Sequence, residues 1–312
     1  MRTNALLVIV VAAAGCYRVP PSSSTQPMQT TEQPSPPAAA PKTPDLDRGK
    51  YLASIAGCAV CHTPLAANGQ PDTSRLFAGG LEDKLPGGGT FRAPNITPDR
   101  GTGIGAWTDE QIIAAVRRGV RPDGAHLLPI MPYPYYHKLT DSDAQALVAY
   151  LRSIPPIPNH VAKSDPGAMR PLDLEEPIGN VDSPAMHGEY LASLMHCAAC
   201  HTPQDGPFAA RAFSGGTQFP TQAGVTLVAP NITADRDTGI GDWSEDDVVR
   251  SVRAMTLPDG SKIRGPMAMY ASAWSQLTDA DAHAVAGYIK SLPAIAHDVR
   301  MDKAPAAPQG TD

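Results

Sequence analysis

Two short strings in this chain share the same spacing of cysteine and histidine. The first runs from Cys58 to His62 as C-A-V-C-H, and the second from Cys197 to His201 as C-A-A-C-H. Two thiols three positions apart can each form a thioether to one vinyl group of a single porphyrin, and the adjacent histidine then lies under the iron. The pattern predicts two covalently bound haem c groups, attached through Cys58, Cys61, Cys197 and Cys200, with His62 and His201 as iron ligands.

Other sites also use a C-x-x-C pair, namely zinc ribbons and thioredoxin-like redox centres. A zinc ribbon needs its second pair close by, and here the two strings are 139 positions apart. A thioredoxin-like centre needs a βαβ context, but no run in this chain alternates convincingly like a strand. The haem interpretation is therefore favoured over both.

Most of the sequence consists of one unit in two copies. Three strings of the first copy recur in the second: 93–97 at 229–233, 102–105 at 238–241, and 122–124 at 258–260. A chain of 312 residues is long enough for two such domains. We assign them to 46–160 and 183–298, with a linker at 161–182 and a tail at 299–312.

Each copy is expected to hold three main helices, which predicts an all-α fold. In the first copy, one helix runs from about Asp47 to Ala56, a second is capped by Thr108, and a third by Thr140. Pro155 ends the third helix, because proline removes a backbone donor. The corresponding caps and stop in the second copy are Ser244, Thr278 and Pro293.

This order of helix, haem loop, helix, ligand loop and helix is the plan of a class I cytochrome c. The sequence therefore predicts two tandem class I cytochrome c-like haem domains. In that plan, the first and last helices cross where a small residue meets an aromatic one. The candidate pairs are Gly49 with Tyr150 and Gly188 with Tyr288.

A haem that only carries electrons needs a second axial ligand, expected in the loop before the last helix. In the first copy Met131 is flanked closely by prolines and is favoured over the rival ligands His126 and His137. In the second copy, counting forward from Pro-Asp-Gly aligns Met267 with Met131, whereas counting back from Leu-Thr-Asp aligns Met269. Met267 is preferred because it follows a proline.

Methionine ligation decides the predicted chemistry. A thioether raises the reduction potential, and two filled axial positions leave no site for oxygen or peroxide. The sequence thus predicts an electron carrier with no catalytic residue of its own. The alternative is a dihaem enzyme such as a cytochrome c peroxidase, which needs an open distal side; the matched methionines argue against it.

Two further residue types recur in matching places. They are the asparagines Asn95 and Asn231 and the tryptophans Trp107 and Trp243. Their polar groups either act at the haem, by hydrogen-bonding the propionates or fixing the loop over the haem edge, or serve loop architecture with no haem contact. The sequence leaves these two roles open.

The N-terminus is interpreted as a lipoprotein-type signal peptide at 1–15. Arg2 precedes an apolar run from Ala5 to Ala14, too short to span a bilayer, and small residues then lead to Cys16. Such a box predicts lipidation of Cys16; the alternative is an ordinary signal cut after Ala14. Tyr17 after the cysteine favours the outer membrane, by analogy with bacterial lipoprotein sorting.

Residues 16–45 form a Pro/Ser-rich tether, with eight prolines between Pro20 and Pro44. Such a segment cannot bury a core and stays extended. We therefore expect a protein held by a lipid anchor on the periplasmic side of a bacterial membrane. Export agrees with covalent haem attachment, which takes place outside the cytoplasm. The net charge of −6, with no basic cluster, excludes nucleic acid as a partner.

Three longer strings, at 93–108, 119–124 and 131–134, resemble the multihaem cytochrome c subunits of bacterial membrane-bound alcohol, sugar-acid and related dehydrogenases. Such subunits take electrons from a catalytic partner and pass them to quinone or a terminal oxidase. The resemblance implies a redox protein partner, either a dehydrogenase, another cytochrome or a terminal oxidase. It also implies the eight haem ligands Cys58, Cys61, His62, Met131, Cys197, Cys200, His201 and Met267. Those subunits commonly carry three haem domains, whereas this chain shows two.

Overall fold

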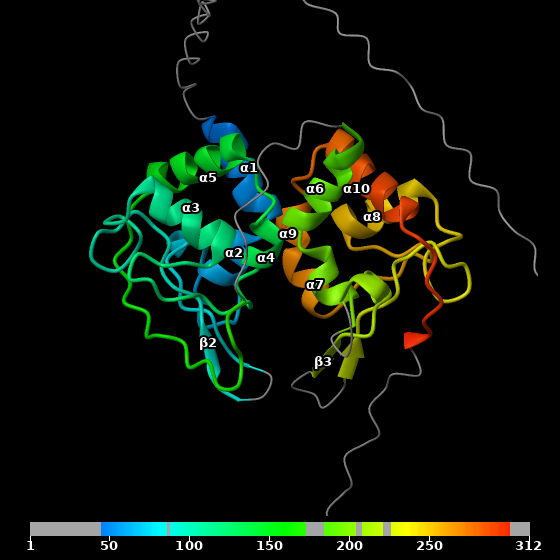
Figure 1. The fold of residues 1–312 in the computed structure, drawn as a ribbon, viewed down its shortest axis with the longest axis horizontal. Coiled ribbons are helices and arrows are strands. Elements are labelled where there is room, and N and C mark those ends of the chain that lie inside the picture. Colours follow the sequence, from blue (N-terminus) through cyan, green and yellow to red (C-terminus); the bar gives the residue numbers. More distant parts are fainter. Residues whose placement is uncertain (1–44, 86–87, 173–183, 204–207, 221–225, 300–312) are drawn as a thin grey trace, which may run out of the picture. The chain divides into compact units, whose positions relative to one another are not determined.

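The helices and strands come in two similar sets, one per sequence copy (Figure 1). The computed structural model describes residues 45–85, 88–172, 184–203, 208–220 and 226–299, all within one compact unit that begins at Thr43. The predicted signal peptide, Cys16 and the tether up to residue 44 lie outside the described residues. So do residues 173–182 of the predicted linker and 300–312 of the tail.

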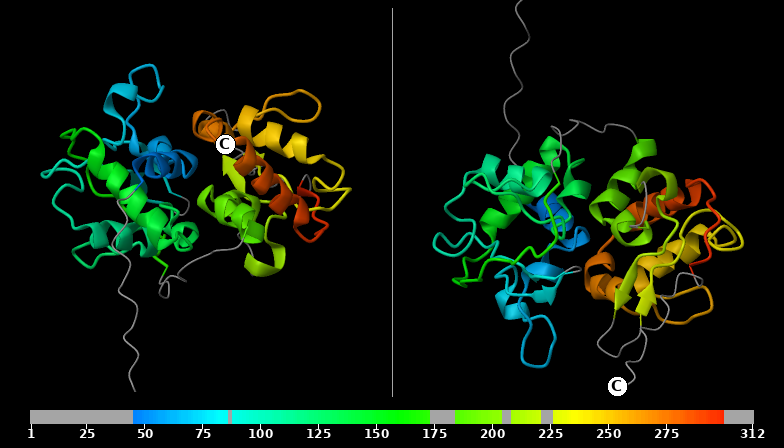
Figure 2. Two further views of the ribbon diagram at one scale, coloured as in Figure 1. Left: turned by 90° about the horizontal axis from the view of Figure 1, so that it is seen from above. Right: turned by 60° about the horizontal axis from the view of Figure 1, so that its bottom comes forward.

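The two sets follow the same order, which can be traced by colour in Figures 1 and 2. The first set is α1 (Leu46–Ile55), α2 (Cys58–His62), η1 (Thr73–Arg75), β1 (Glu82–Lys84), β2 (Thr90–Arg92), α3 (Asp109–Arg118), α4 (Tyr133–Tyr136) and α5 (Asp141–Ser153). The second is α6 (Pro184–Leu194), α7 (Cys197–His201), η2 (Phe208–Arg211), β3 (Gln218–Pro220), β4 (Thr226–Val228), α8 (Glu245–Ala254), η3 (Pro266–Tyr270), α9 (Ala271–Trp274) and α10 (Asp279–Ser291). Helices predominate, in agreement with the all-α prediction. Each set also has one antiparallel hairpin of three-residue strands that the sequence did not predict.

The predicted helix starts are confirmed by their hydrogen bonds. The Thr108 hydroxyl accepts from the Gln111 backbone, and the Gln111 side chain accepts from the Thr108 backbone, which completes a capping box. Ser244 forms the corresponding box in the second domain. Thr140 and Thr278 cap α5 and α10 through their hydroxyl oxygens. Helices α3 and α5 of the first domain, and α8 and α10 of the second, therefore begin at the residues whose side chains cap them.

The first and last helices of each domain touch through their backbones. A Cβ atom added at Gly49 would lie 2.0 Å from the Ala146 carbonyl oxygen and 2.8 Å from Tyr150 Cβ. The same atom at Gly188 would lie 2.1 Å from the Ala284 oxygen. Both predicted crossings are confirmed, because only glycine leaves room for the helices to approach this closely.

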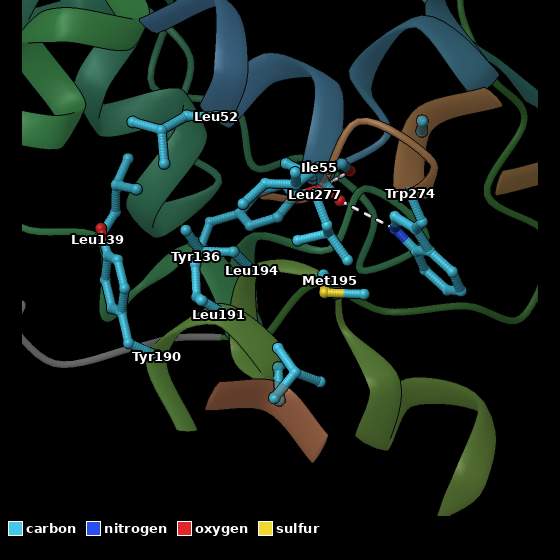
Figure 3. Packing of buried hydrophobic residues seen from close by; sticks show 14 of the residues in the cluster. Leu52, Ile55, Tyr136, Leu139, Tyr190, Leu191, Leu194, Met195, Trp274 and Leu277 are labelled. Carbon is cyan, nitrogen blue, oxygen red and sulfur yellow. Dashed lines mark hydrogen bonds between the residues drawn. The ribbon is translucent and has the colours of Figure 1, made fainter. Parts of the chain in front are cut away.

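The two domains share one apolar core, part of which is shown in Figure 3. Ser54 Oγ donates to the Ala273 carbonyl at 3.4 Å, and Ser193 Oγ donates to the Tyr135 carbonyl at 3.0 Å. The serines are equivalent in the two copies, and so are their acceptors. Equivalent surfaces therefore meet, as in a dimer with two-fold symmetry.

Charged groups at this interface follow the same symmetry. The Arg48 guanidinium donates two hydrogen bonds to Asp143 at 2.9 and 2.7 Å, and the Tyr190 hydroxyl of the other domain donates a third at 2.6 Å. Burial works to raise the pKa of the Asp143 carboxyl. The bonds from Arg48 and Tyr190 outweigh it, so the pKa lies below its usual value.

The equivalent carboxylate in the second domain is Asp281. It accepts from the Tyr51 hydroxyl of the first domain, and its Oδ1 lies 2.6 Å from His187 Nε2. His187 occupies the place of Arg48. The duplication has therefore kept the tyrosine–carboxylate contact on both sides, while the nitrogen-bearing side chain beside the carboxylate differs.

The helix crossing provides a direct test of the fold. Replacing Gly49 by alanine (Gly49→Ala) forces a methyl group into the Ala146 carbonyl, and we expect a loss of about 1–3 kcal/mol of unfolding free energy. Gly287→Ala in α10 is the matched control, since the nearest atom to its new Cβ would be a side-chain oxygen of Glu245 in α8, 3.9 Å away. That substitution should be neutral or stabilise by up to about 1 kcal/mol. Denaturant unfolding of the haem-loaded protein measures both, and equal stability of the two variants would contradict the crossing.

Candidate haem-binding sites

Each C-x-x-C-H string forms its own short helix, α2 or α7. The residue before each helix has a left-handed backbone, with φ of 69° at Gly57 and 45° at His196. This turn ends the long helix α1 or α6 and starts the motif helix in a new direction. Residues three and four positions apart share one face of a helix. The two cysteines and the histidine of each motif are therefore presented on one side, as one porphyrin requires.

The two histidines are oriented by identical contacts. His62 Nδ1 lies 2.7 Å from the Pro94 carbonyl oxygen, and His201 Nδ1 lies 2.8 Å from the Pro230 carbonyl oxygen. A carbonyl can only accept, so Nδ1 carries the proton and Nε2 is left with its lone pair. Burial lowers the pKa of both imidazoles, which favours the neutral form. A neutral imidazole with a free Nε2 is the donor that haem iron takes, so these residues fit the group.

The loops that carry these carbonyls are held by asparagine. Asn95 Nδ2 donates to the Ile157 carbonyl at 2.7 Å, and Asn95 Oδ1 accepts from the Thr97 backbone at 2.9 Å. Asn231 makes the equivalent bonds in the second domain. Both ends of each amide are thus engaged in the loop. Of the two roles left open by the sequence, these contacts favour loop architecture over haem propionate binding. Trp107 and Trp243 are half-buried and pack against the core.

The motif cysteines lie in apolar surroundings. Burial raises the pKa of Cys58 and of Cys197 to about 12, which shows that the surroundings of both sulfurs disfavour a charge. Within the described residues, no group of three or more His, Cys, Asp or Glu side chains is placed to hold a metal ion directly. The zinc interpretation of the C-x-x-C pairs therefore gains no support from the structure.

The methionine candidates differ in exposure. Met131 and Met267 are both half-buried and pack against the apolar core, whereas the Met269 side chain is 54% exposed. Among the rival ligands of the first domain, His126 is exposed. His137 Nδ1 lies 3.3 Å from the Arg117 carbonyl oxygen. The first two methionines thus occupy matching environments in the two domains.

An aromatic cluster that the sequence did not predict lies beside both motifs. The Tyr270 ring stacks on Trp274 with centroids 4.8 Å apart and meets the His196 ring edge-on at 5.2 Å. Trp274 Nε1 donates to the Ile55 carbonyl of the first domain at 3.0 Å (Figure 3). Burial raises the pKa of Tyr270. Its hydroxyl therefore stays protonated beside sulfurs of both motifs.

Both halves of the chain match one family. The cytochrome c family profile covers residues 46–155 and 185–293, and each segment contains one C-x-x-C-H motif. The chain belongs to the cytochrome c family. It is 32% identical over 314 residues to a "diheme cytochrome c-type" protein of Cereibacter sphaeroides, across 93% of this chain and 96% of the relative. This cytochrome c chain therefore binds two covalent haem c groups, as predicted, and functions in electron transfer.

Longer relatives belong to dehydrogenases. The chain is 35% identical over 275 residues to the cytochrome c subunit of the quinone alcohol dehydrogenase of Gluconobacter oxydans, across 80% of this chain and 55% of that subunit. It is also 35% identical over 271 residues to the gluconate 2-dehydrogenase cytochrome c subunit of Pantoea cypripedii, across 80% of this chain and 60% of that subunit. The resemblance predicted from the sequence is confirmed. The chain spans little more than half the length of these subunits.

Proposed function

We propose that the chain is a membrane-tethered dihaem carrier that takes electrons from a periplasmic dehydrogenase and passes them to a further redox protein. When bound, haem c supplies one-electron chemistry between ferric and ferrous iron. The observation that carries the proposal is the equivalence of the two sites, because His62 and His201 receive the same carbonyl contact. Two equivalent sites in one chain suit stepwise transfer of single electrons.

In this proposal each domain holds its haem in the class I manner. Cys58 and Cys61 provide the thioether bonds of the first site, and Cys197 and Cys200 those of the second. Met131 and Met267 complete the axial ligands opposite the histidines. Their matching half-buried positions support this assignment, as does the exposure of Met269. The close crossings at Gly49 and Gly188 support the class I plan.

The peroxidase alternative is less well supported. Such an enzyme needs one haem with an open distal side, and hence two unlike sites. Here the methionines Met131 and Met267 occupy matching environments, and the matched dehydrogenase relatives are named as cytochrome c subunits. A carrier with no catalytic residue accounts for these observations.

Methionine substitution separates the two functions. We expect Met131→Ala and Met267→Ala each to open one haem, so that the reduced protein binds carbon monoxide and the ferric methionine–iron charge-transfer band falls by half. Met269→Ala is the matched control and should leave optical spectra unchanged. Carbon monoxide binding by the unaltered protein would contradict the carrier role. If, of the two second-domain variants, only Met269→Ala changes the spectrum, Met269 and not Met267 is the iron ligand of the second domain.

A dehydrogenase partner can be tested in membranes. The relatives' enzymes are named for an alcohol, gluconate, fructose and nicotinate, which are therefore the substrates to add. We expect one substrate to reduce the haems of this protein in membranes of its own organism, which is seen as a rise of their α-band. Membranes lacking the chain are the control and should show no such reduction. If dithionite reduces the protein and none of the substrates does, the dehydrogenase partnership is wrong.

The membrane attachment is proposed to come from the lipidated Cys16. Among the described residues, no helix is both long and apolar enough to cross a bilayer. The small residues before Cys16 and the proline-rich segment 16–45 support an anchor and a spacer on the periplasmic side, at the outer membrane.

The anchor makes a simple prediction about fractionation. Cys16→Ser removes the acceptor for the lipid, so the haem protein should move from the membrane fraction to the soluble periplasmic fraction. Its haem spectrum should stay unchanged, which controls for misfolding. A Cys16→Ser protein that still sediments with membranes at high salt would contradict lipid anchoring.

A further inference from the structure

One aromatic ring touches the entry to both haem motifs. Tyr270 ends η3 of the second domain, and its Cε1 would lie 2.5 Å from a Cβ atom placed on Gly57 of the first domain. The same ring meets the His196 ring edge-on, with centroids 5.2 Å apart. Gly57 directly precedes Cys58, and His196 directly precedes Cys197. Tyr270 therefore lies between the two attachment sites.

The duplication is broken at this point. By the spacing of the copies, His196 stands where the first domain has Gly57. Tyr270 stands where the first domain has Pro132, counted back from Leu-Thr-Asp, or Pro134, counted forward from Pro-Asp-Gly, so a proline takes its place in either count. Two symmetry-related tyrosines could not both fill the centre of a close-packed interface. Glycine at position 57 leaves space for the single ring, since any side chain there would collide with it.

His196 keeps its contact with Tyr270 in spite of a strained backbone conformation. Its φ of 45° is a left-handed conformation that favours glycine, as its counterpart Gly57 has. The imidazole is buried, and it packs against Tyr270 and, at a centroid distance of 6.3 Å, against Tyr136. His196 thus combines a strained backbone conformation with a side chain that fills the space between the domains.

The cysteines that follow these residues belong to the same core. Cys58 and Cys197 both pack against the apolar cluster that joins the domains, and so does Tyr270. Each porphyrin is bonded at one of these sulfurs. The sulfurs that would hold one edge of each haem therefore lie at the domain interface, next to Gly57 and His196, the two residues that Tyr270 contacts.

We infer that the Tyr270 ring, packed between Gly57 and His196, is the contact through which electrons pass between the two haem sites. With haem bound, the iron of one domain would be oxidised from ferrous to ferric while that of the other would be reduced from ferric to ferrous. One electron moves, and no bond forms or breaks. Tunnelling between redox centres weakens steeply when packed atoms are replaced by a gap, so a filled interface favours it. The inference rests on the proposed carrier role but does not depend on the partner.

The experiment compares electron exchange in half-reduced, haem-loaded protein. Exchange between the two haems averages their paramagnetically shifted methyl signals in NMR spectra, and dilution separates intramolecular from intermolecular exchange. Tyr270→Phe keeps the ring and should exchange like the unaltered protein. Tyr270→Ala and the better-packed Tyr270→Leu should slow intramolecular exchange several-fold. Optical spectra and the reduction potentials of both haems, which should stay unchanged, show that the ligands are intact.

Leu139→Ala is the matched control. Leu139 is buried in the same interdomain cluster, so its truncation also leaves a cavity there. Unchanged exchange in both the Ala and Leu variants of Tyr270 overturns the inference. Equal slowing in the Leu139 variant overturns it as well, because the effect would then be general loosening.

The readout also separates this inference from the proposed function. Exchange is measured in the isolated protein with a chemical reductant, and no dehydrogenase is needed. Normal exchange with no reduction by any dehydrogenase substrate would overturn the partnership and leave the inference standing. Reduction by a dehydrogenase, with exchange insensitive to Tyr270, would overturn the inference alone.

Discussion

The contact on which each domain depends is the bond from a histidine Nδ1 to a backbone carbonyl. In the first domain that carbonyl belongs to Pro94, 32 residues after His62, and in the second the separation is 29 residues. The carbonyl is fixed because the next residue, Asn95, ties the loop to Ile157, beyond the last helix. One imidazole is therefore oriented by the haem motif, the middle loop and the chain after α5 together. Haem ligation and the domain fold are parts of one hydrogen-bonded arrangement.

The sequence predicted the features that local chemistry decides. Helix starts could be read from Thr108 and Thr140 because a capping hydroxyl acts within three residues. The crossing at Gly49 could be read because a glycine at a helix contact has a steric cause. The hairpins could not, since strands of three residues are too short to show an alternating pattern.

The interface between the domains escaped prediction for a different reason. Tyr51 and Tyr190 lie on helices, where an aromatic residue usually means a domain core. Only the folded chain shows that each hydroxyl donates to a carboxylate of the other domain, Asp281 or Asp143. The aligned copies did contain one usable signal. Gly57 and His196 occupy equivalent positions of the two copies but differ strongly in size, which marks a place where the two-fold symmetry of the interface must fail.

This shared core has a consequence for the two sites as a unit. Cys58 and Cys197 pack against one apolar cluster, so an attachment sulfur of each domain borders the same core. The buried interior is close-packed and transmits small displacements. The residues before the two motifs differ, because His196, which precedes Cys197, packs its imidazole on Tyr270, whereas Gly57, which precedes Cys58, offers only backbone to the same ring. An interface built from two equivalent surfaces is therefore asymmetric at the residues that precede the two attachment motifs.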